Sequence, residues 1–275
     1  MKLTVLCDNN TYIDRYYKGE PAFSCLIEDG EKTVLFDTGY SDVYLENADA
    51  MQLDLGSVTD IALSHGHNDH TGGLGAFFSR FITPVTLTAC PEVFDKKHLD
   101  TLEIGSPLSR EDLPGNVSLR LTKDAIPLTE HVTFLGFIPR VCPFEQNRAV
   151  GERLVCGKAV PDNLPEDTAL TLLLPKGQFI VTGCSHSGIV NICERALSLY
   201  PDKPILGILG GFHLRKACAE SEKTAIALSS LVQGTLYPCH CTCLDVKMQL
   251  AHYLPVKEVG VSLQLLFAGN EISDM

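Results

Sequence analysis

A cluster of histidines constrains this 275-residue chain more than any other feature. The segment ALSHGHNDHTGG holds three of the nine histidines, His65, His67 and His70, together with Asp69. Residues two apart on a helix point in different directions, so the spacing predicts an irregular loop in which alternate side chains converge on one point. Imidazole nitrogen and carboxylate oxygen suit zinc, with iron or manganese as alternatives. The cluster therefore predicts a metal site; the alternative is a polar turn whose histidines are only solvated.

Three further histidines follow apolar runs in the same way. VTDIALS, residues 58–64, is predicted to be a buried strand that ends where the cluster begins. Later runs lead to CSHSG with His186, to GGFHL with His213 and to PCHCT with His240. Four strand ends are thus expected to deliver histidines, and the distant ones are the partners that a metal site requires.

The rest of the chain alternates strand-like and helix-like patterns. The first forty residues alternate apolar and polar positions around an Asp29-Gly30 turn, as antiparallel strands do, and a second hairpin is expected around Lys176-Gly177. The middle is rich in Pro, Gly and charge and is interpreted as two strands with long loops. No composition shift divides the chain, so we expect one domain over residues 1–275. Helices are predicted over residues 41–51, 72–81, 91–99 and 188–200. The loop-rich middle spans residues 105–166.

The composition narrows the classes of partner. A formal net charge of −12 argues against binding to nucleic acid or anionic membranes, which need clustered Lys and Arg, and favours a small-molecule substrate. The chain has no apolar run of about 18 residues and no signal-peptide pattern at its start, so we expect a cytoplasmic protein. Its eleven cysteines, an odd number, are expected to be reduced, buried or metal-bound. The oligomeric state is left open.

The motifs resemble those of one family. SHGHNDHTGG resembles the H-x-H-x-D-H signature of the metallo-β-lactamase superfamily, and LFDTG, which contains Asp37, resembles an upstream motif of the same superfamily. TGCSHSG, GGFHL, PCHCT and FIPRVCPFE are similar to a branch labelled dihydropterin-methyl-ribofuranosylaminobenzene-phosphate synthase. The resemblance runs from about Leu35 to Cys243. It implies an α/β (α+β) fold, a four-layer αββα sandwich of two mixed β-sheets with the metal site at one sheet edge.

The resemblance also implies a ligand set for two zinc ions, with manganese or iron as alternatives. His65, His67 and a later histidine, expected to be His186, would bind one ion, and Asp69, His70 and His240 a second. A bridging water or hydroxide would then be activated for hydrolysis. Asp69 could also orient this hydroxide, and Asp37 would support a ligand histidine by a hydrogen bond.

One departure from the superfamily pattern leaves alternatives open. Many members carry a bridging aspartate in a Gly-Asp step, where this chain has Gly183-Cys184. Cys184 could bind as a thiolate, His186 could take over with His213 nearby, or the second site could be weak. His213 is a candidate catalytic residue, and the alternatives are a residue that supports a ligand or faces the substrate.

Two further features carry weaker hypotheses. Cys239, Cys241 and Cys243 alternate, so on a strand they would share one face with His240 opposite; we expect them to pack, and a separate cysteine-bound metal is the alternative. Arg140, in the loop-rich middle, is a candidate for binding an anionic substrate through its planar fork, against a solvated loop position.

The sequence thus predicts a metal-dependent, dinuclear hydrolase of a small metabolite, with phosphorylated compounds among the candidates. Three alternatives remain: an iron redox enzyme, a dihydropterin-related synthase, and a metal-bound protein that binds a ligand without turnover.

Overall fold

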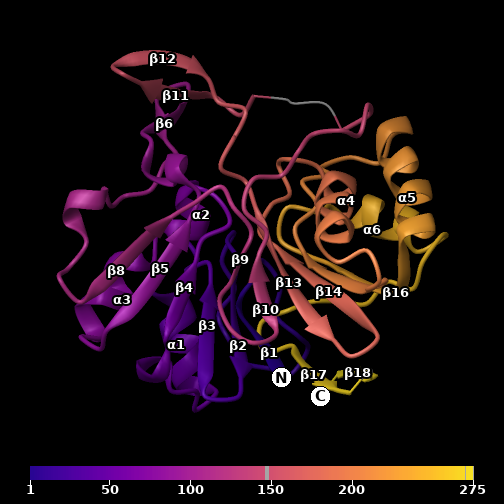
Figure 1. Ribbon diagram of the computed structural model, residues 1–275, viewed down its shortest axis with the longest axis horizontal. Coiled ribbons are helices and arrows are strands. Elements are labelled where there is room, and N and C mark those ends of the chain that lie inside the picture. The colour runs from indigo at the N-terminus through magenta and orange to yellow at the C-terminus, as the bar shows by residue number, and fades with distance from the viewer. Residues whose placement is uncertain (146–148, 270, 275) are drawn as a thin grey trace.

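The largest sheet contains the N-terminal strands. A computed structural model describes residues 1–145, 149–269 and 271–274 (Figure 1). In this eight-stranded sheet the first strands are antiparallel, as the alternation predicts, and the last four are parallel, so the sheet is mixed. Its strands, in spatial order, are β18 (Glu271–Asp274), β17 (Gln264–Ala268), β1 (Lys2–Cys7), β2 (Ser24–Asp29), β3 (Lys32–Phe36), β4 (Asp60–Ala62), β5 (Val85–Ala89) and β8 (Val117–Leu121).

A second mixed sheet contains the C-terminal strands. Its six strands, in spatial order, are β16 (Val232–Pro238), β15 (Ile205–Gly210), β14 (Gly177–Thr182), β13 (Ala169–Leu174), β10 (Val132–Phe134) and β9 (Ile126–Pro127). β13 and β14 form the hairpin expected around Lys176-Gly177, whereas β14, β15 and β16 are parallel. Thr182 pairs with Gly210, and Gly210 pairs with Pro238. The three parallel strands therefore end level with one another, so the loops that follow them start at one edge of the sheet.

The two sheets pack face to face with helices outside both (Figure 1). One core cluster lies between the sheets and includes Phe36 of the first and Phe179 of the second. Outer clusters pack α1 (Val43–Ala50) and α3 (Leu74–Arg80) on the first sheet, and α4 (Ile189–Leu199), α5 (Ala219–Leu231) and α6 (Leu244–Leu250) on the second. Each buried Leu, Ile or Phe side chain contributes roughly 1.5–3 kcal/mol to this packing. The four-layer αββα sandwich expected from the sequence is confirmed.

The apolar stripe of α4 shows how the sequence forms such a layer. Ile189, Ile192, Cys193 and Ala196 recur at intervals of three and four residues and are all buried. This spacing places them on one face of a helix, which packs against the second sheet. α4 begins directly after the loop with His186, so its packing also anchors that loop.

Two predictions in the middle of the chain were wrong. The helix predicted over residues 91–99 is a single 3-10 turn, Pro91–Phe94, followed by strand β6 (Lys97–Leu99), because pairing with β11 (Glu152–Val155) outweighs local helix propensity. The described residues of 105–166 hold five strands rather than two. Two of them, β11 and β12 (Lys158–Pro161), join β6 and β7 (Leu102–Glu103) in a small sheet at the top of Figure 1. Other 3-10 turns span Leu55–Ser57 and Arg110–Asp112.

No helix in the described part of the chain combines the length and the apolar character needed to cross a bilayer.

Candidate metal centre

The histidine cluster follows β4, as expected, but it is not a loop throughout. His65 lies outside any helix or strand and His67 in extended backbone, whereas Asp69 and His70 lie on a one-turn helix, α2 (Asn68–Thr71), which starts after His67. The expectation of an irregular loop is therefore wrong for its second half. His65 and His67 fall in one group of candidate ligands and Asp69 and His70 in another, which is the division that the resemblance implies.

The loops after β14, β15 and β16 bring the distant candidates to the same place. They carry Cys184 and His186, then His213, then His240. His213 and His240 adopt φ values of +48° and +49°, in a left-handed region that residues other than glycine rarely occupy. Such strained positions concentrate at functional sites, where the surrounding structure holds them.

The first ligand group consists of His65, His67 and His186, whose ligand atoms lie within 4.8 Å of one another. His65 Nε2 is 3.1 Å from His67 Nδ1. Burial lowers the pKa of His65 and of His186 well below the usual value and that of His67 to about 4. The three imidazoles are therefore neutral at neutral pH, which is the form that binds metal ions.

The second ligand group consists of Asp69, His70, Cys184 and His240. His70 Nε2 lies 3.2 Å from both Cys184 Sγ and His240 Nε2, and Asp69 Oδ2 lies 3.3 Å from His240 Nε2. Burial opposes the charge of His70, but Asp69 and Asp37 outweigh it and raise the pKa of His70 to about 9. The group therefore attracts a positive charge, which a proton or a metal cation can supply.

Asp37 connects the two groups through Ser64. Asp37 Oδ1 accepts a hydrogen bond from Ser64 N, and Asp37 Oδ2 accepts from Ser64 Oγ and from His70 Nδ1, each at 2.7 Å. Because the Ser64 hydroxyl donates to Asp37, it accepts from His65 Nδ1 at 2.9 Å. Both histidines thus keep a proton on Nδ1 and direct Nε2 at the centre.

This arrangement also explains the glycine before Cys184. A Cβ atom on Gly183 would lie 2.1 Å from Ser64 Oγ and 2.9 Å from Asp37 Oδ2. Any side chain there would displace the Asp37–Ser64 pair.

His240 is held by two residues that the sequence analysis missed. Asp8 Oδ1 accepts from His240 N at 2.9 Å, and Asn9 Oδ1 lies 3.1 Å from His240 Nδ1. With its Nδ1 proton directed at Asn9, His240 presents the Nε2 lone pair to His70. Asp8 and Asn9 follow β1 and lie more than two hundred residues from His240 in the chain, so local patterns carry no signal for the contact.

A second set of residues that the sequence analysis missed supports the backbone beside the first ligand group. Lys97 is buried and lies 2.8 Å from both Asp162 and Glu166, and Glu166 Oε1 accepts from Gly66 N at 3.3 Å. Asp167 Oδ2 accepts from Ser187 N at 2.8 Å. The segment before β13 therefore holds the backbone beside His65, His67 and His186. The sequence signal that could have identified this segment is the acidic pair Glu166-Asp167 shortly before the apolar strand β13.

The donor set fits metal ions. His186 Nε2 and His213 Nδ1 are buried and have no hydrogen-bond partner among the described residues. Buried polar atoms are nearly always paired, so unpaired nitrogens at a cluster of imidazoles indicate a missing ligand. Burial raises the pKa of the Cys184 thiol well above its usual value, so its thiolate needs a neighbouring cation. Imidazole, carboxylate and thiolate together suit zinc.

The cysteines near His240 do not share one face. β16 ends at Pro238, so Cys239 to Cys243 leave the strand and the predicted alternation does not apply. Cys239 is fully buried in the core between the sheets, and Cys243 precedes α6. Cys241 instead lies with Cys184 and His213, and the ligand atoms of these three are within 4.8 Å of one another.

Arg140 is partly buried near the segment that precedes β13. Its Nη2 donates to the carbonyl oxygens of Asn163 and Leu164 at 2.5 and 2.9 Å. Burial lowers the pKa of Arg140. The structure does not place it in any of the three ligand groups.

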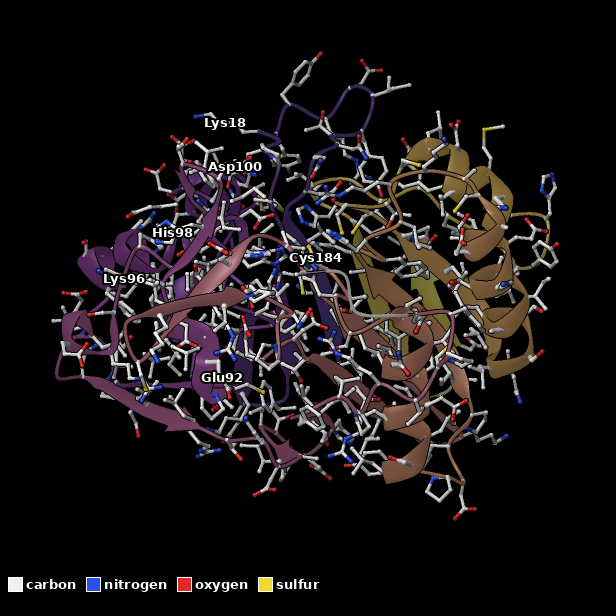
Figure 2. All side chains as sticks on the ribbon, turned by 90° about the horizontal axis from the view of Figure 1, so that it is seen from above. Lys18, Glu92, Lys96, His98, Asp100 and Cys184 are labelled. Carbon is white, nitrogen blue, oxygen red and sulfur yellow. The ribbon has the colours of Figure 1, made fainter. Side chains whose placement is uncertain are left out.

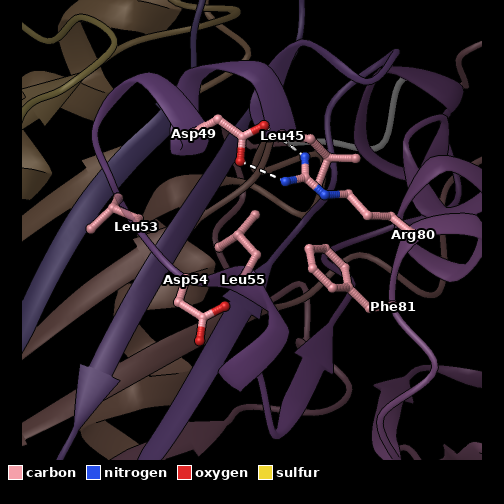
Figure 3. Close-up of a pocket in the computed structure, with 7 residues that line it drawn as sticks. All are labelled: Leu45, Asp49, Leu53, Asp54, Leu55, Arg80 and Phe81. Carbon is pink, nitrogen blue, oxygen red and sulfur yellow. Dashed lines mark hydrogen bonds and ion pairs between the residues drawn. The ribbon is translucent and has the colours of Figure 1, made fainter.

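A small pocket elsewhere has a different character. It has a volume of about 70 Å³ and lies between α1 and the end of α3 (Figure 3). Arg80 is already paired there with Asp49 through two hydrogen bonds of 2.6 and 2.8 Å. None of its lining residues belongs to the ligand groups, so we treat it as unrelated to the centre. They are Leu45, Asp49, Leu53, Asp54, Leu55, Arg80 and Phe81.

Comparisons with known sequences agree with this geometry. A sequence model of the metallo-β-lactamase superfamily matches residues 17–96. The 7,8-dihydropterin-6-methyl-4-(beta-D-ribofuranosyl)-aminobenzene-5'-phosphate synthase of Methanocaldococcus jannaschii is 31% identical over 225 residues, which cover 77% of this chain and 76% of that protein. Uncharacterized protein MJ0448 of the same organism is 29% identical over 244 residues, covering 87% and 90%.

Comparisons with solved structures extend over nearly the whole chain. Tm1679, described as a metal-dependent hydrolase of the beta-lactamase superfamily, superposes with a TM-score of 0.82 at 27% identity, over 98% of this chain and 99% of that one. A diphosphatase from the PhnP family has a TM-score of 0.57 at 17% identity, over 97% and 98% of the two chains, and shares the fold.

Proposed function

Because the chain belongs to the metallo-β-lactamase superfamily, we propose that it is a dinuclear metal-dependent hydrolase of a small metabolite. The observation that supports this proposal is the presence of two adjacent ligand groups, His65, His67 and His186 beside Asp69, His70, Cys184 and His240. We expect zinc at both, with manganese or iron as alternatives. Phosphorylated metabolites are the first candidates for substrates.

The ions would supply Lewis acidity and a water acidic enough to attack a phosphoryl or acyl centre at neutral pH. The residues of the chain orient this chemistry. Asp37 and Asn9 keep the protons of His70 and His240 on Nδ1, so both Nε2 atoms face the centre. Burial works against the ionised carboxylate of Asp69, but His70 and His240 lower its pKa, so it stays ionised at neutral pH and can accept a hydrogen bond or bind a cation at the centre.

Two further residues are proposed to act beside these ligand groups. The His213 ring lies 4.2 Å from that of His186, between centroids, so it borders the first ligand group. Arg140 uses only Nη2 for its two hydrogen bonds to the backbone, and a guanidinium has five N–H donors. Its other donors would serve an anionic substrate, and Arg140→Ala should then raise KM without lowering metal content.

A second candidate is a dihydropterin-related synthase. The observation in its favour is the identity of 31% to a protein that carries this name. The two functions differ in the bond that changes, since a synthase joins two substrates and a hydrolase consumes water. Mass spectrometry of products from a dihydropterin and an aryl amine, set beside hydrolysis assays, separates them.

The experiment compares His67→Ala with His131→Ala. His131 pairs with Asp29 at 2.9 Å and lies outside the ligand groups, so it is the control for the loss of one histidine. We expect the wild type to bind at least two equivalents of zinc or manganese and to hydrolyse phosphoesters or lactones. His67→Ala should lose a metal ion and this activity, whereas His131→Ala should keep both. Unchanged hydrolysis in His67→Ala, or iron with reductant-dependent turnover, would refute the proposal.

We also propose a cytoplasmic location. All eleven cysteines are free thiols in the structure, and reducing compartments keep thiols in this form. Fractionation of the native cells tests it.

A further inference from the structure

A second cysteine lies beside the centre and has no role in the dinuclear pair. Cys241 Sγ accepts from His213 N at 3.3 Å and lies 3.7 Å from the carbonyl oxygen of Cys184. The ligand atoms of Cys184, His213 and Cys241 lie within 4.8 Å of one another. Three protein ligands with one position left open is the usual composition of a non-structural zinc site.

The packing around Cys241 directs its sulfur to this point. A Cβ atom on Gly211 would lie 2.5 Å from Cys241 Sγ and 2.6 Å from the carbonyl oxygen of Gly183, so only glycine lets the sulfur approach the loop after β15. The backbone N–H of His213 then points at the sulfur. An N–H donor of this kind favours a thiolate, the form of cysteine that binds metal.

A second observation concerns His213. His213 Nδ1 is buried and has no hydrogen-bond partner among the described residues. Zinc bonds of about 2.3 Å to sulfur and 2.0–2.1 Å to nitrogen put tetrahedral ligand atoms roughly 3.5–3.8 Å apart. Since the three ligand atoms are already within 4.8 Å, small side-chain rotations suffice to close such a site.

We infer that Cys184, His213 and Cys241 form a third, sulfur-rich site for a thiophilic cation, zinc(II) or copper(I), next to the dinuclear pair. Cys184 is shared, because it also belongs to the group of Asp69, His70 and His240, and in this respect the inference rests on the proposed function. Two thiolates and one imidazole select soft ions over manganese or magnesium. Cys184 lies near the middle of the molecule in Figure 2, between the two large sheets.

The test measures metal content and sulfur coordination in Cys241→Ser and in Cys243→Ser. Cys243 lies two residues further on, outside every ligand group, so its substitution is the matched control for the loss of one thiol. After loading with zinc, elemental analysis should find three equivalents in the wild type and in Cys243→Ser, and two in Cys241→Ser. After loading with cobalt, the thiolate-to-cobalt charge-transfer absorption should fall by more than half in Cys241→Ser, because only Cys184 remains as a sulfur ligand.

His213→Ala provides a second route to the site if Cys241→Ser folds poorly. It should also lose one equivalent of zinc while circular dichroism stays unchanged. Equal zinc content and equal cobalt absorption in the wild type and Cys241→Ser would overturn the inference. A Cys184–Cys241 disulfide in peptides of the purified wild type would overturn it too. If the wild type and Cys241→Ser each bind two equivalents of zinc and hydrolyse substrate, the proposed function survives and the third site fails. If the wild type binds three equivalents without hydrolysis, the third site survives and the proposed function fails.

Discussion

Replacing Asp37 with asparagine tests how the centre is organised. The carboxylate is fully buried and accepts three hydrogen bonds of 2.7 Å, from Ser64 N, Ser64 Oγ and His70 Nδ1. Asparagine has nearly the same shape but only one acceptor oxygen. If this oxygen faces Ser64 N, the amide N–H groups point at Ser64 Oγ and His70 Nδ1. If it faces His70, they oppose the N–H of Ser64.

Either orientation loses at least one hydrogen bond to a charged acceptor. Such a bond contributes about 1.5–3 kcal/mol, and a buried donor left unpaired costs about 1–3 kcal/mol. Loss of a partner that orients a ligand histidine typically weakens metal binding by about 10–100-fold, or roughly 1.4–2.8 kcal/mol. We therefore expect Asp37→Asn to bind zinc about 10–100-fold more weakly in the group that contains His70. His65 is linked to Asp37 only through Ser64, so its group should weaken less.

Competition with a chromophoric zinc chelator measures this change, and Asp29→Asn is the matched control. Asp29 accepts hydrogen bonds from Thr129 Oγ1 and His131, as Asp37 does from a hydroxyl and a histidine, but it lies outside the ligand groups. Zinc affinity in the control should equal that of the wild type. If Asp37→Asn folds and binds zinc as tightly as the wild type, Asp37 does not orient the ligands and the reasoning is wrong.

Two other perturbations test the supporting contacts. Burial raises the pKa of Glu145 from its ordinary 4.5 to about 7, although its carboxylate accepts from Val190 N at the start of α4. The folded state therefore binds the proton more tightly than the unfolded state does. The wild type should lose stability as pH rises from about 5 to 8, whereas Glu145→Gln should not. If the urea midpoints of the two proteins change in parallel across this range, the expectation is wrong. Lys97→Met should lower the free energy of unfolding by about 3–5 kcal/mol in urea titrations, because it takes the ammonium group away from the buried carboxylates of Asp162 and Glu166. Lys123→Met, which removes a half-exposed pair with Glu92, should cost about 0–1 kcal/mol, and equal losses in the two variants would refute the role of burial.

Local patterns in the sequence determined the candidate ligand types and the layer architecture. Alternation, apolar runs and the Asp29-Gly30 turn depend on side-chain direction along one element, so they predicted β2, β3, α3, α4, β13 and β14 at nearly the right residues. The same patterns placed histidines after four strands, and the structure brings these histidines together. Lys97–Leu99 shows the limit of such reasoning, because a helix-like run became a strand through pairing with Glu152–Val155, more than fifty residues later.

Only the tertiary structure decided how the ligands are divided and held. The level ends of β14, β15 and β16 follow from the pairing of Thr182, Gly210 and Pro238, and this register brings Cys184 and Cys241 together from loops that are 57 residues apart. The contact of Asp8 with His240 likewise joins β1 to the end of β16 across the two sheets. Such contacts depend on strand register and sheet packing, which involve pairs of distant elements. The periodicity of a single segment carries no information about such contacts.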